Sequence, residues 1–445
     1  MSASPRLLLV SFSALLFFTC AAAAQTTVPA RPADQFVDSM GINVHMEYAN
    51  TPYKHYDAIN AALGTLGMRH FRDEINDTDP RFVRELHHIG ELGYTLCGLI
   101  EGGNDYPRHG TRLDPDAVVS IIQNLLPTID AVEGPNEPDG GGFVYDHVRY
   151  PRGAIHEAED LWSIVKSSPE ISFLPVISLS EGNAPDFVRL AKNTRVPADF
   201  VTFGNLHAYQ GGLVGDHNLT NWYMPFSRDL TGRAGLWITE MGYHNNTRYL
   251  GGGQQQGVSQ RASAIYLPTA FLSEFNHGIL RSFSYELIDE FSDPAFQSAE
   301  GHFGILNHDG TPKPAYFALQ NLIAILQERG SQAFTPGSLA ITFSGAPPTL
   351  RYTLLQKSGG TYYLAIWNDI RVYQIATQFS PGADLYPQNV PITVTFSEAH
   401  PLGVYAPNDA TGTHPTRTYT ISTTGHSITI KLPPQVLLLK LRADN

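Results

Sequence analysis

The chain contains eight short apolar runs in its first three quarters, and each run is long enough to form one strand. Most of these runs lack a strict alternation of apolar and polar residues, which is typical of strands buried on both faces of a parallel sheet. The runs are Met40–His45, Met68–Glu74, Tyr94–Glu101, Ala131–Pro135, Phe173–Ser180, Phe200–His207, Gly235–Glu240 and Ile279–Glu286.

Helical patterns occupy most of the intervals between these runs. Asp79–Pro80 and Asp114–Pro115 each place an N-cap residue before a proline at the first helical position. The expected helices are His55–Leu66, Pro80–Leu92, Asp114–Leu126, Ala154–Lys166, Ala184–Thr194, Ser259–Phe275 and Pro314–Glu328. Between the sixth and seventh runs we expect a long loop and no helix. Strand–helix alternation around eight strands predicts an α/β chain folded as a (β/α)8 TIM barrel and not as a doubly wound sheet.

The pattern changes after Arg329. From Ser338 to Ala443 the chain has short alternating runs and turn residues without a helical pattern, which predicts a C-terminal antiparallel β-sandwich. The expected strands are Ala340–Phe343, Thr349–Gln356, Thr361–Trp367, Gln374–Phe379, Ile392–Phe396, Thr418–Thr423, Ser427–Lys431 and Val436–Leu441. We therefore expect a barrel over residues 25–330 and an accessory sandwich over residues 331–445.

Residues 1–24 have the pattern of a secretory signal peptide. Arg6 gives a positive n-region, Leu7–Phe18 is an apolar segment too short for a stable membrane anchor, and Ala21–Ala24 offers a cleavage site. The residues before Cys20 fit a lipoprotein signal poorly. We expect a secreted or periplasmic protein that does not associate with membranes after cleavage.

Cys97 would then be the only cysteine, so no intramolecular disulfide is possible. It lies in an apolar run, which predicts a buried and unreactive thiol. The 17 histidines show no convincing ligand spacing, so we predict no catalytic metal, and no motif calls for a cofactor. A formal net charge of −13 disfavours binding to nucleic acid. The sequence leaves the oligomeric state open.

Two glutamates occupy positions suited to paired carboxyl chemistry. Glu137, in Ala-Val-Glu-Gly-Pro-Asn-Glu-Pro-Asp, lies just past the fourth strand, and Glu240, in Leu-Trp-Ile-Thr-Glu-Met-Gly, ends the seventh. In a barrel, catalytic groups are found at the carboxyl ends of the strands. Cleavage of a glycosidic bond requires two carboxyl groups that flank the bond. The two glutamates are therefore candidates for that reaction.

The pair Asn136–Glu137 after strand four, together with Glu240 at the end of strand seven, resembles the clan A retaining glycoside hydrolases. The resemblance covers roughly residues 35–325, and a barrel followed by a β-sandwich most resembles family 39 and its neighbours, which include xylosidase-, arabinosidase- and galactosidase-like enzymes. It implies that Glu137 is the general acid/base and Glu240 the nucleophile, about 5 Å apart. Asn136 would bind the sugar 2-hydroxyl.

The same resemblance implies roles for other residues. His207 and Tyr209 match a His-x-Tyr pattern after strand six, where the tyrosine would orient the nucleophile and keep it ionised. Arg72, at the end of strand two, would lie beside the nucleophile, or alternatively would pair with Asp73 or Glu74. His207 could instead be a core histidine.

The remaining candidates would contact sugar. Asn43 and His45 end strand one, and Tyr285 would replace the tryptophan that many clan A barrels have in strand eight. Glu286, which follows Tyr285, would bind hydroxyl groups or lie in a solvated loop. Trp222, in the loop after strand six, would be a further sugar platform or a core residue.

We therefore predict a retaining glycoside hydrolase that acts on a plant or microbial polysaccharide or oligosaccharide. With only four tryptophans in the chain, a long open cleft is disfavoured, which favours exo action. A transglycosylase with the same residues remains an alternative. So does a carbohydrate-binding protein without catalysis.

Overall fold

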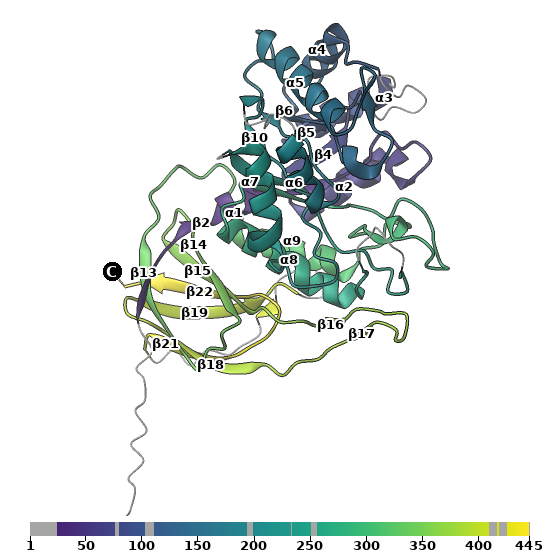
Figure 1. Ribbon diagram of the computed structural model, residues 1–445. Coiled ribbons are helices and arrows are strands. Elements are labelled where there is room, and N and C mark those ends of the chain that lie inside the picture. The colour runs from purple at the N-terminus through teal and green to yellow at the C-terminus, as the bar shows by residue number, and fades with distance from the viewer. Residues whose placement is uncertain are drawn as a thin grey trace, which may run out of the picture.

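The computed structural model describes residues 25–75, 80–102, 111–193, 199–232, 234–250, 256–408, 416–417 and 425–444. The predicted signal peptide, the predicted strand Thr418–Thr423 and the predicted N-cap Asp79 lie outside the described residues. Figure 1 shows a helix-rich part that carries most of the first three quarters of the chain, with a sheet domain packed against it.

In the described part of the chain, eight parallel strands close into a barrel in the order β10-β11-β12-β3-β4-β5-β6-β9. Each strand overlaps one of the predicted runs. The barrel strands are β3 (Met40–Asn43), β4 (His70–Glu74), β5 (Thr95–Leu99), β6 (Ile129–Glu133), β9 (Val176–Ile177), β10 (Phe203–Gly204), β11 (Gly235–Met241) and β12 (Arg281–Ser284). The predicted barrel is therefore confirmed.

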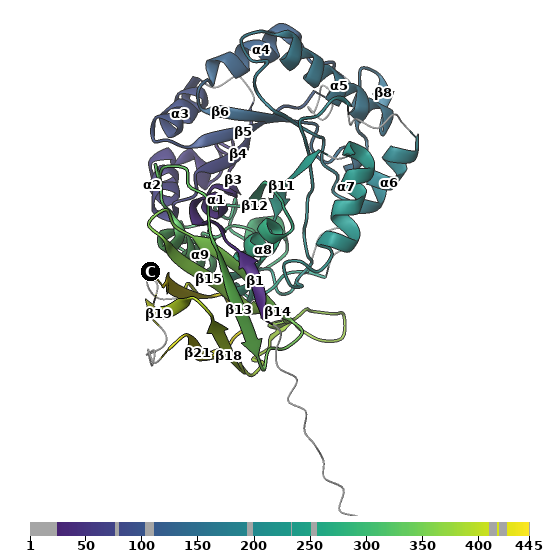
Figure 2. The same cartoon turned by 90° about the vertical axis from the view of Figure 1, so that its left-hand side faces the viewer.

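The helices form a ring outside the strands, as Figure 2 shows. They are α1 (Ala33–Asp38), α2 (Tyr56–Leu66), α3 (Pro80–Glu91), α4 (Pro115–Asn124), α5 (Arg152–Ser167), α6 (Ala184–Asn193), α7 (Met224–Thr231), α8 (Gln260–Asn276) and α9 (Pro314–Leu326). Short 3₁₀ turns cover Pro52–Lys54, Pro138–Gly140 and Glu300–His302. The Asp114 side chain accepts a hydrogen bond from the Asp116 backbone N–H at 3.1 Å and caps α4, as the sequence predicts.

The prediction of a long loop without a helix between strands six and seven is wrong. α7 lies there and follows a π-helical turn at Leu219–Tyr223. Hydroxyl side chains make up part of its buried face: Ser227 donates to the carbonyl of Asn205, and Thr231 to that of Ser227, both at 2.8 Å. A helix buried partly through hydroxyl groups lacks the apolar period that would predict it.

The sheet domain consists of two facing sheets, which confirms the predicted sandwich. One has the order β1-β13-β18-β21 and the other β2-β14-β15-β22-β19-β20. Their strands are β1 (Thr26–Pro29), β2 (Arg31–Pro32), β13 (Ser338–Ser344), β14 (Leu350–Gln356), β15 (Thr361–Asn368), β18 (Val390–Phe396), β19 (Ala399–Ala406), β20 (Thr416–Arg417), β21 (Ser427–Leu432) and β22 (Leu437–Ala443). All pairs are antiparallel except β2 with β14.

Three details of the sandwich differ from prediction. β1 and β2 belong to its sheets, so the domain takes up residues that we assigned to the barrel; their partners lie some 300 positions away and leave no local signal. β19 was missed because Pro401 and Gly403, where the pairing register shifts, interrupt its pattern. The predicted strand Gln374–Phe379 is reduced to β16 (Tyr373–Gln374), which pairs with β17 (Ala383–Asp384) outside both sheets.

A further small hairpin, β7 (Val144–Tyr145) with β8 (Val148–Arg149), follows barrel strand β6.

The apolar core of the barrel extends to one face of the sandwich, whose two sheets enclose a second apolar core between them. Trp367, on β15, is fully buried in the cluster that also contains the apolar face of α8. The Val372 backbone N–H donates to the Tyr266 hydroxyl at 2.8 Å, and Asn276 donates to the carbonyl of Tyr352 at 3.1 Å. These contacts join the sandwich domain to α8 of the barrel.

Candidate active site

A cavity of about 650 Å³ lies at the carboxyl ends of the barrel strands. Its volume is that of a typical small-molecule site. Of the residues predicted to act in catalysis or sugar binding, those that line it are Asn43, His45, Arg72, Asn136, Glu137, Tyr209, Glu240 and Tyr285. The fold therefore brings residues from six of the eight strand ends into one place, although they are spread over more than half of the chain.

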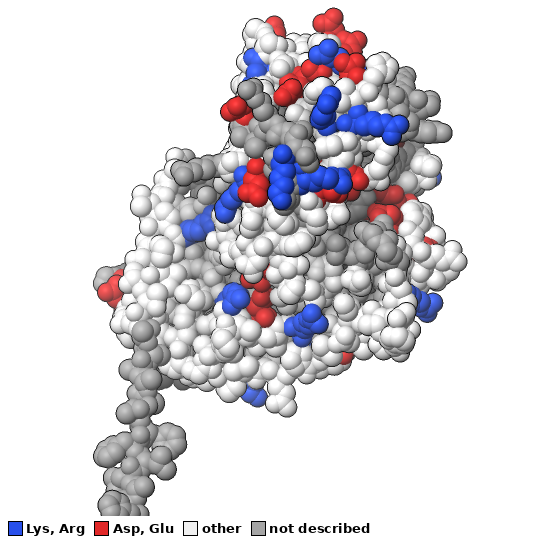
Figure 3. Space-filling model, in the orientation of Figure 1, with Lys and Arg blue, Asp and Glu red and all other residues white. Residues whose placement is uncertain are grey.

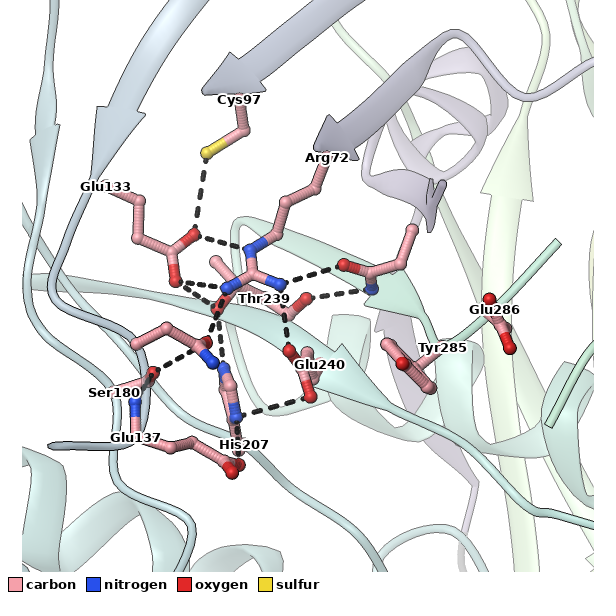
Figure 4. A network of polar contacts seen from close by, with 12 residues as sticks. Arg72, Cys97, Glu133, Glu137, Ser180, His207, Thr239, Glu240, Tyr285 and Glu286 are labelled. Carbon is pink, nitrogen blue, oxygen red and sulfur yellow. Dashed lines mark hydrogen bonds and ion pairs between the residues drawn. The ribbon is translucent and has the colours of Figure 1, made fainter. Parts of the chain in front are cut away.

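Arg72 is the centre of the polar network in this cavity (Figure 4). Its guanidinium donates to Oε1 of Glu240 at 2.8 Å, to both carboxylate oxygens of Glu133 at 2.8 and 2.9 Å, to Asn136 at 2.8 Å and to Asn43 at 3.0 Å. A guanidinium has five N–H donors, so each one has an acceptor here. Of the two alternatives for Arg72, the structure places it beside Glu240.

Glu133 is a functional residue that the sequence analysis missed. It is fully buried at the end of β6. Besides Arg72, its carboxylate accepts hydrogen bonds from Asn205 and from Thr239, both at 2.9 Å, and from the thiol of Cys97 at 3.7 Å. The available signal was a single acidic residue within an apolar strand run. Burial raises the pKa of the Cys97 thiol well above its ordinary value, in line with the predicted inert cysteine.

Glu240 has both carboxylate oxygens held by donors. Oε1 accepts from Arg72 at 2.8 Å, and Oε2 accepts from the Tyr209 hydroxyl at 2.7 Å. The residue is only 8% exposed, and the exposed part faces the cavity. Donors on both oxygens fix the orientation of the carboxylate, as a nucleophile requires.

The Glu137 carboxyl group is in close contact with the His207 ring. It has a left-handed backbone (φ 39°), and its N–H donates to the Ser180 hydroxyl at 3.2 Å. Oε1 lies 2.6 Å from Nδ1 of His207. One oxygen of Glu137, one of Glu240 and one ring nitrogen of His207 all lie within 4.8 Å of one another. The carboxyl groups are thus about as close as a retaining glycosidase requires.

The tautomer of His207 follows from its second contact. Nε2 lies 3.2 Å from the hydroxyl of Thr239, whose only proton is directed to the oxygens of Glu133 or Asn205. The hydroxyl can therefore only accept from His207, so Nε2 carries a hydrogen. The short contact between Nδ1 and Glu137 then holds one shared proton.

The pKa shifts of Glu137 and His207 bear on where that proton lies. The negative charge of Glu240 would by itself favour a protonated Glu137. Burial raises the pKa of Glu137, but the hydrogen bond and charge of His207 outweigh burial, and the net shift is downward. Burial lowers the pKa of His207, but Glu240 and Glu137 outweigh it, and the net shift is upward. Both shifts favour the shared proton on His207, one hydrogen bond away from Glu137.

Tyr285 and His45 form one wall of the cavity, and Glu286 lies behind them. Nε2 of His45 is 3.2 Å from the Tyr285 hydroxyl, and burial lowers the pKa of His45 to about 4, so its ring is neutral. Glu286 is fully buried, does not line the cavity, and accepts a hydrogen bond from Tyr53 at 2.9 Å. The structure therefore does not bring Glu286 to the cavity as a sugar-binding residue, because its side chain points into the packed interior.

Trp222 also lies apart from the cavity. It is 41% exposed and packs edge-on against Phe226, with ring centroids 4.8 Å apart. The helical turn that precedes α7 sets this direction. The sequence analysis expected a loop here, and a loop does not define the direction of the Trp222 side chain.

Glu101 lines the cavity but was not among the predicted site residues. Glu101, just past β5, accepts a hydrogen bond from the backbone N–H of Asn136 at 2.7 Å and so holds the segment that carries Glu137. Burial and the nearby Glu74 raise the pKa of Glu101 to about 8. Glu101 could have been found from the sequence, because it ends the third predicted strand.

We expect Arg72→Met to destabilise the protein by about 3–5 kcal/mol, because the change leaves Glu133 and Glu240 buried without their cation. Urea unfolding of purified protein measures this. Arg112→Met is the matched control, since Arg112 pairs with Asp160 at the surface and should have little effect. An Arg72→Met protein as stable as the Arg112→Met protein would contradict the role given to the network.

Glu101 should make stability depend on pH. Its pKa is about 8 in the folded chain and ordinarily 4.5, so the folded state binds the proton more tightly, and stability is lost as pH rises from about 4.5 to about 8. Glu101→Gln keeps an acceptor for Asn136 but cannot ionise. Relative to wild type, the variant should gain stability over this window in chemical unfolding at pH 4 to 9. A difference that does not change with pH would contradict the assignment.

No protein-family model matches this sequence, and no curated protein matches it. Solved structures do share its fold. A family 39 glycoside hydrolase from the gut symbiont Bacteroides cellulosilyticus WH2 superposes with a TM-score of 0.63 at 14% identity, over 93% of this chain and 82% of that chain. A monomeric β-xylosidase from Caulobacter crescentus CB15 gives 0.58 at 13% identity, over 95% and 98% of the two chains.

A family 39 enzyme from Xanthomonas axonopodis pv. citri gives a TM-score of 0.56 at 15% identity, over 96% of this chain and 99% of that chain. The matches span nearly the whole chain, so they include the sheet domain as well as the barrel. The chain therefore has the fold of family 39 glycoside hydrolases, as its motifs predicted.

Proposed function

We propose that this protein is a retaining glycoside hydrolase in which Glu240 is the nucleophile and Glu137 the general acid/base. The observation that carries the proposal is the pair of carboxyl groups within 4.8 Å at the ends of strands four and seven, one held by Arg72 and Tyr209 and the other by a histidine. A retaining mechanism requires this separation, because the second carboxylate itself attacks the sugar.

In the first step a Glu240 oxygen bonds to the anomeric carbon, and the bond from that carbon to the leaving oxygen breaks. The leaving oxygen takes a proton from Glu137, which draws on the proton shared with Nδ1 of His207. In the second step the Glu137 carboxylate accepts a proton from water, the water oxygen bonds to the anomeric carbon, and the bond to Glu240 breaks. Both carboxyl groups and the shared proton are then restored.

The cavity lining favours a sugar without negative charge. Among the described lining residues Arg72 is the one Lys or Arg, and acceptors within the protein already occupy its N–H groups. The other charged groups are carboxyls, which would repel a uronic acid. The cavity volume of about 650 Å³ and the small number of tryptophans support exo action on a plant or microbial polysaccharide or its oligosaccharides.

A transglycosylase would use the same residues and differ only in whether water or a sugar accepts the glycosyl group. The intact carboxyl pair is the argument against a binding protein without catalysis. A panel of nitrophenyl glycosides tests all three functions. We expect release of nitrophenol from at least one neutral glycoside, with the first-formed sugar in the anomeric configuration of the substrate by NMR. Added acceptor sugars would divert the product if transfer dominates, and an inverted product would contradict the proposal.

We also propose that residues 1–24 direct export to the periplasm or the medium. In the described part of the chain no helix has the length and apolarity to span a bilayer. On the face shown in Figure 3, Lys and Arg are interspersed with Asp and Glu, which fits a carbohydrate partner better than nucleic acid. Expression in a bacterial host with N-terminal sequencing tests the leader: the exported protein should begin at Gln25, and an intact Met1 would refute it.

A further inference from the structure

Three side chains with metal-ligating atoms meet at one end of the sandwich, far from the catalytic cavity in the sequence. His400 lies on β19, His426 directly precedes β21, and Asp444 directly follows β22. Nε2 of His400 is 2.9 Å from Oδ1 of Asp444, and Nδ1 of His426 is 3.7 Å from Oδ2. One ligand atom from each residue lies within 4.8 Å of the other two.

The surroundings of His400 suit a bound cation. Its Nδ1 faces the carbonyl oxygen of Gly425 at 3.4 Å, while Nε2 faces the carboxylate. A neutral imidazole has a single N–H and can satisfy only one of these acceptors. With the hydrogen on Nδ1 the ring donates to the carbonyl, and Nε2 is left with a lone pair directed at the cluster. Metal-ligating histidines are commonly oriented by such a backbone carbonyl.

The backbone and the neighbouring ring hold the other two groups. The imidazoles of His400 and His426 stack with centroids 4.3 Å apart and planes 26° apart. Nδ1 of His426, which faces Asp444, also lies 3.2 Å from the carbonyl oxygen of Ala399, and it gives up this contact when it binds an ion. The backbone N–H of Asp444 donates to the carbonyl of Glu398 at 2.9 Å, which fixes the residue beside β19. All three ligands are therefore attached to paired strands and not to a free terminus.

We propose that His400, His426 and Asp444 form a site for a zinc-like divalent transition metal ion. Two imidazoles and one carboxylate are ligands that zinc prefers, and calcium or magnesium would require mainly oxygen ligands. Tetrahedral zinc with bonds of 2.0–2.1 Å separates its ligand atoms by about 3.3 Å. The contacts of 2.9 and 3.7 Å lie on either side of that value.

The three side chains are partly exposed, which indicates a metal site that is open to solvent. The side chains are 44%, 39% and 37% exposed, so an ion can enter from solvent and water can fill the fourth position. β19 and β22 belong to one sheet and β21 to the other, so the ion would link the two sheets of the sandwich. Because the ion binds only the folded arrangement, zinc would stabilise the protein. The three ligands are far apart in sequence, which explains why their spacing predicted no metal site.

The test uses the full chain with any affinity tag removed and with metal stripped by a chelator. Zinc is titrated by calorimetry into wild type, His400→Ala, His426→Ala and Asp444→Asn, with His277→Ala as the matched control because His277 is exposed at the end of α8. We expect each of the three variants to lose one equivalent of bound zinc that wild type and the control keep. Saturating zinc should raise the Tm of wild type by about 3 °C or more but leave that of the three variants unchanged.

Comparison with the variants also separates this site from the cluster of Glu137, His207 and Glu240, where zinc could bind as well. Zinc at that cluster would remain in all variants and would inhibit glycoside cleavage. Equal zinc stoichiometry in wild type and in His400→Ala would overturn the proposal. So would a Tm that responds to pH through these histidines but not to zinc, since a doubly protonated His400 would then explain the contacts.

Discussion

Replacement of Glu240 by Ala is expected to lower kcat for aryl glycosides by roughly 10⁴–10⁶-fold, the range seen when a catalytic nucleophile is removed. Glu240 is the only side chain in our mechanism that bonds to the anomeric carbon. The alanine variant should still fold, since Arg72 keeps the Glu133 carboxylate as its partner. Steady-state kinetics together with a thermal melt measure both properties.

Azide provides the positive readout for this variant. It can enter the space left by the Glu240 side chain and attack the anomeric carbon, and the product should be a glycosyl azide of inverted configuration. Glu91→Ala is the matched control, because Glu91 is a highly exposed glutamate at the end of α3 and should leave kcat unchanged. A Glu240→Ala enzyme with near wild-type kcat would end the assignment.

Replacement of Glu137 by Ala should lower kcat by about 10²–10⁴-fold for substrates with poor leaving groups, the usual contribution of general acid–base catalysis. With a nitrophenol leaving group the first step needs little protonation, so the loss should be smaller, and the covalent intermediate should accumulate as a burst. Azide should restore turnover and give a glycosyl azide of retained configuration, because Glu240 still forms the intermediate. An equal loss for good and poor leaving groups would contradict the role of Glu137 as acid.

The barrel was predictable because its strands are continuous apolar runs with a helical pattern between them. Elements whose burial does not depend on continuous apolar runs could not be predicted from the sequence. α7 has part of its buried face in the hydroxyls of Ser227 and Thr231, and β19 is interrupted by Pro401 and Gly403. β1 gains its hydrogen bonds only from β13, far along the chain. In each case the stabilising contacts are tertiary and leave no local pattern.

The candidate site likewise contains some residues that the sequence could predict and others that it could not. The position of Glu137 and Glu240 at the cavity was predictable, since each lies at a strand end within a recognisable motif. Glu133 was not, because a buried carboxylate has meaning only once Arg72, from a strand two positions along the barrel, is seen to neutralise it. The proton shared by His207 and Glu137 could not be predicted from the sequence either, because its position depends on the hydrogen bonds of the Thr239 hydroxyl. Glu286 shows the reverse error: its position beside Tyr285 suggested sugar contact, but its side chain is fully buried.

The measurement that tests the central claim most directly is the capture of the covalent intermediate. The protein is incubated with the 2-deoxy-2-fluoro analogue of the sugar that the glycoside panel identifies, carrying a good leaving group, and the digest is examined by mass spectrometry. We expect one fluorosugar per chain, attached to the peptide that contains Glu240. An adduct on another residue, or turnover with an inverted anomeric centre and no adduct, would contradict the two-glutamate double displacement.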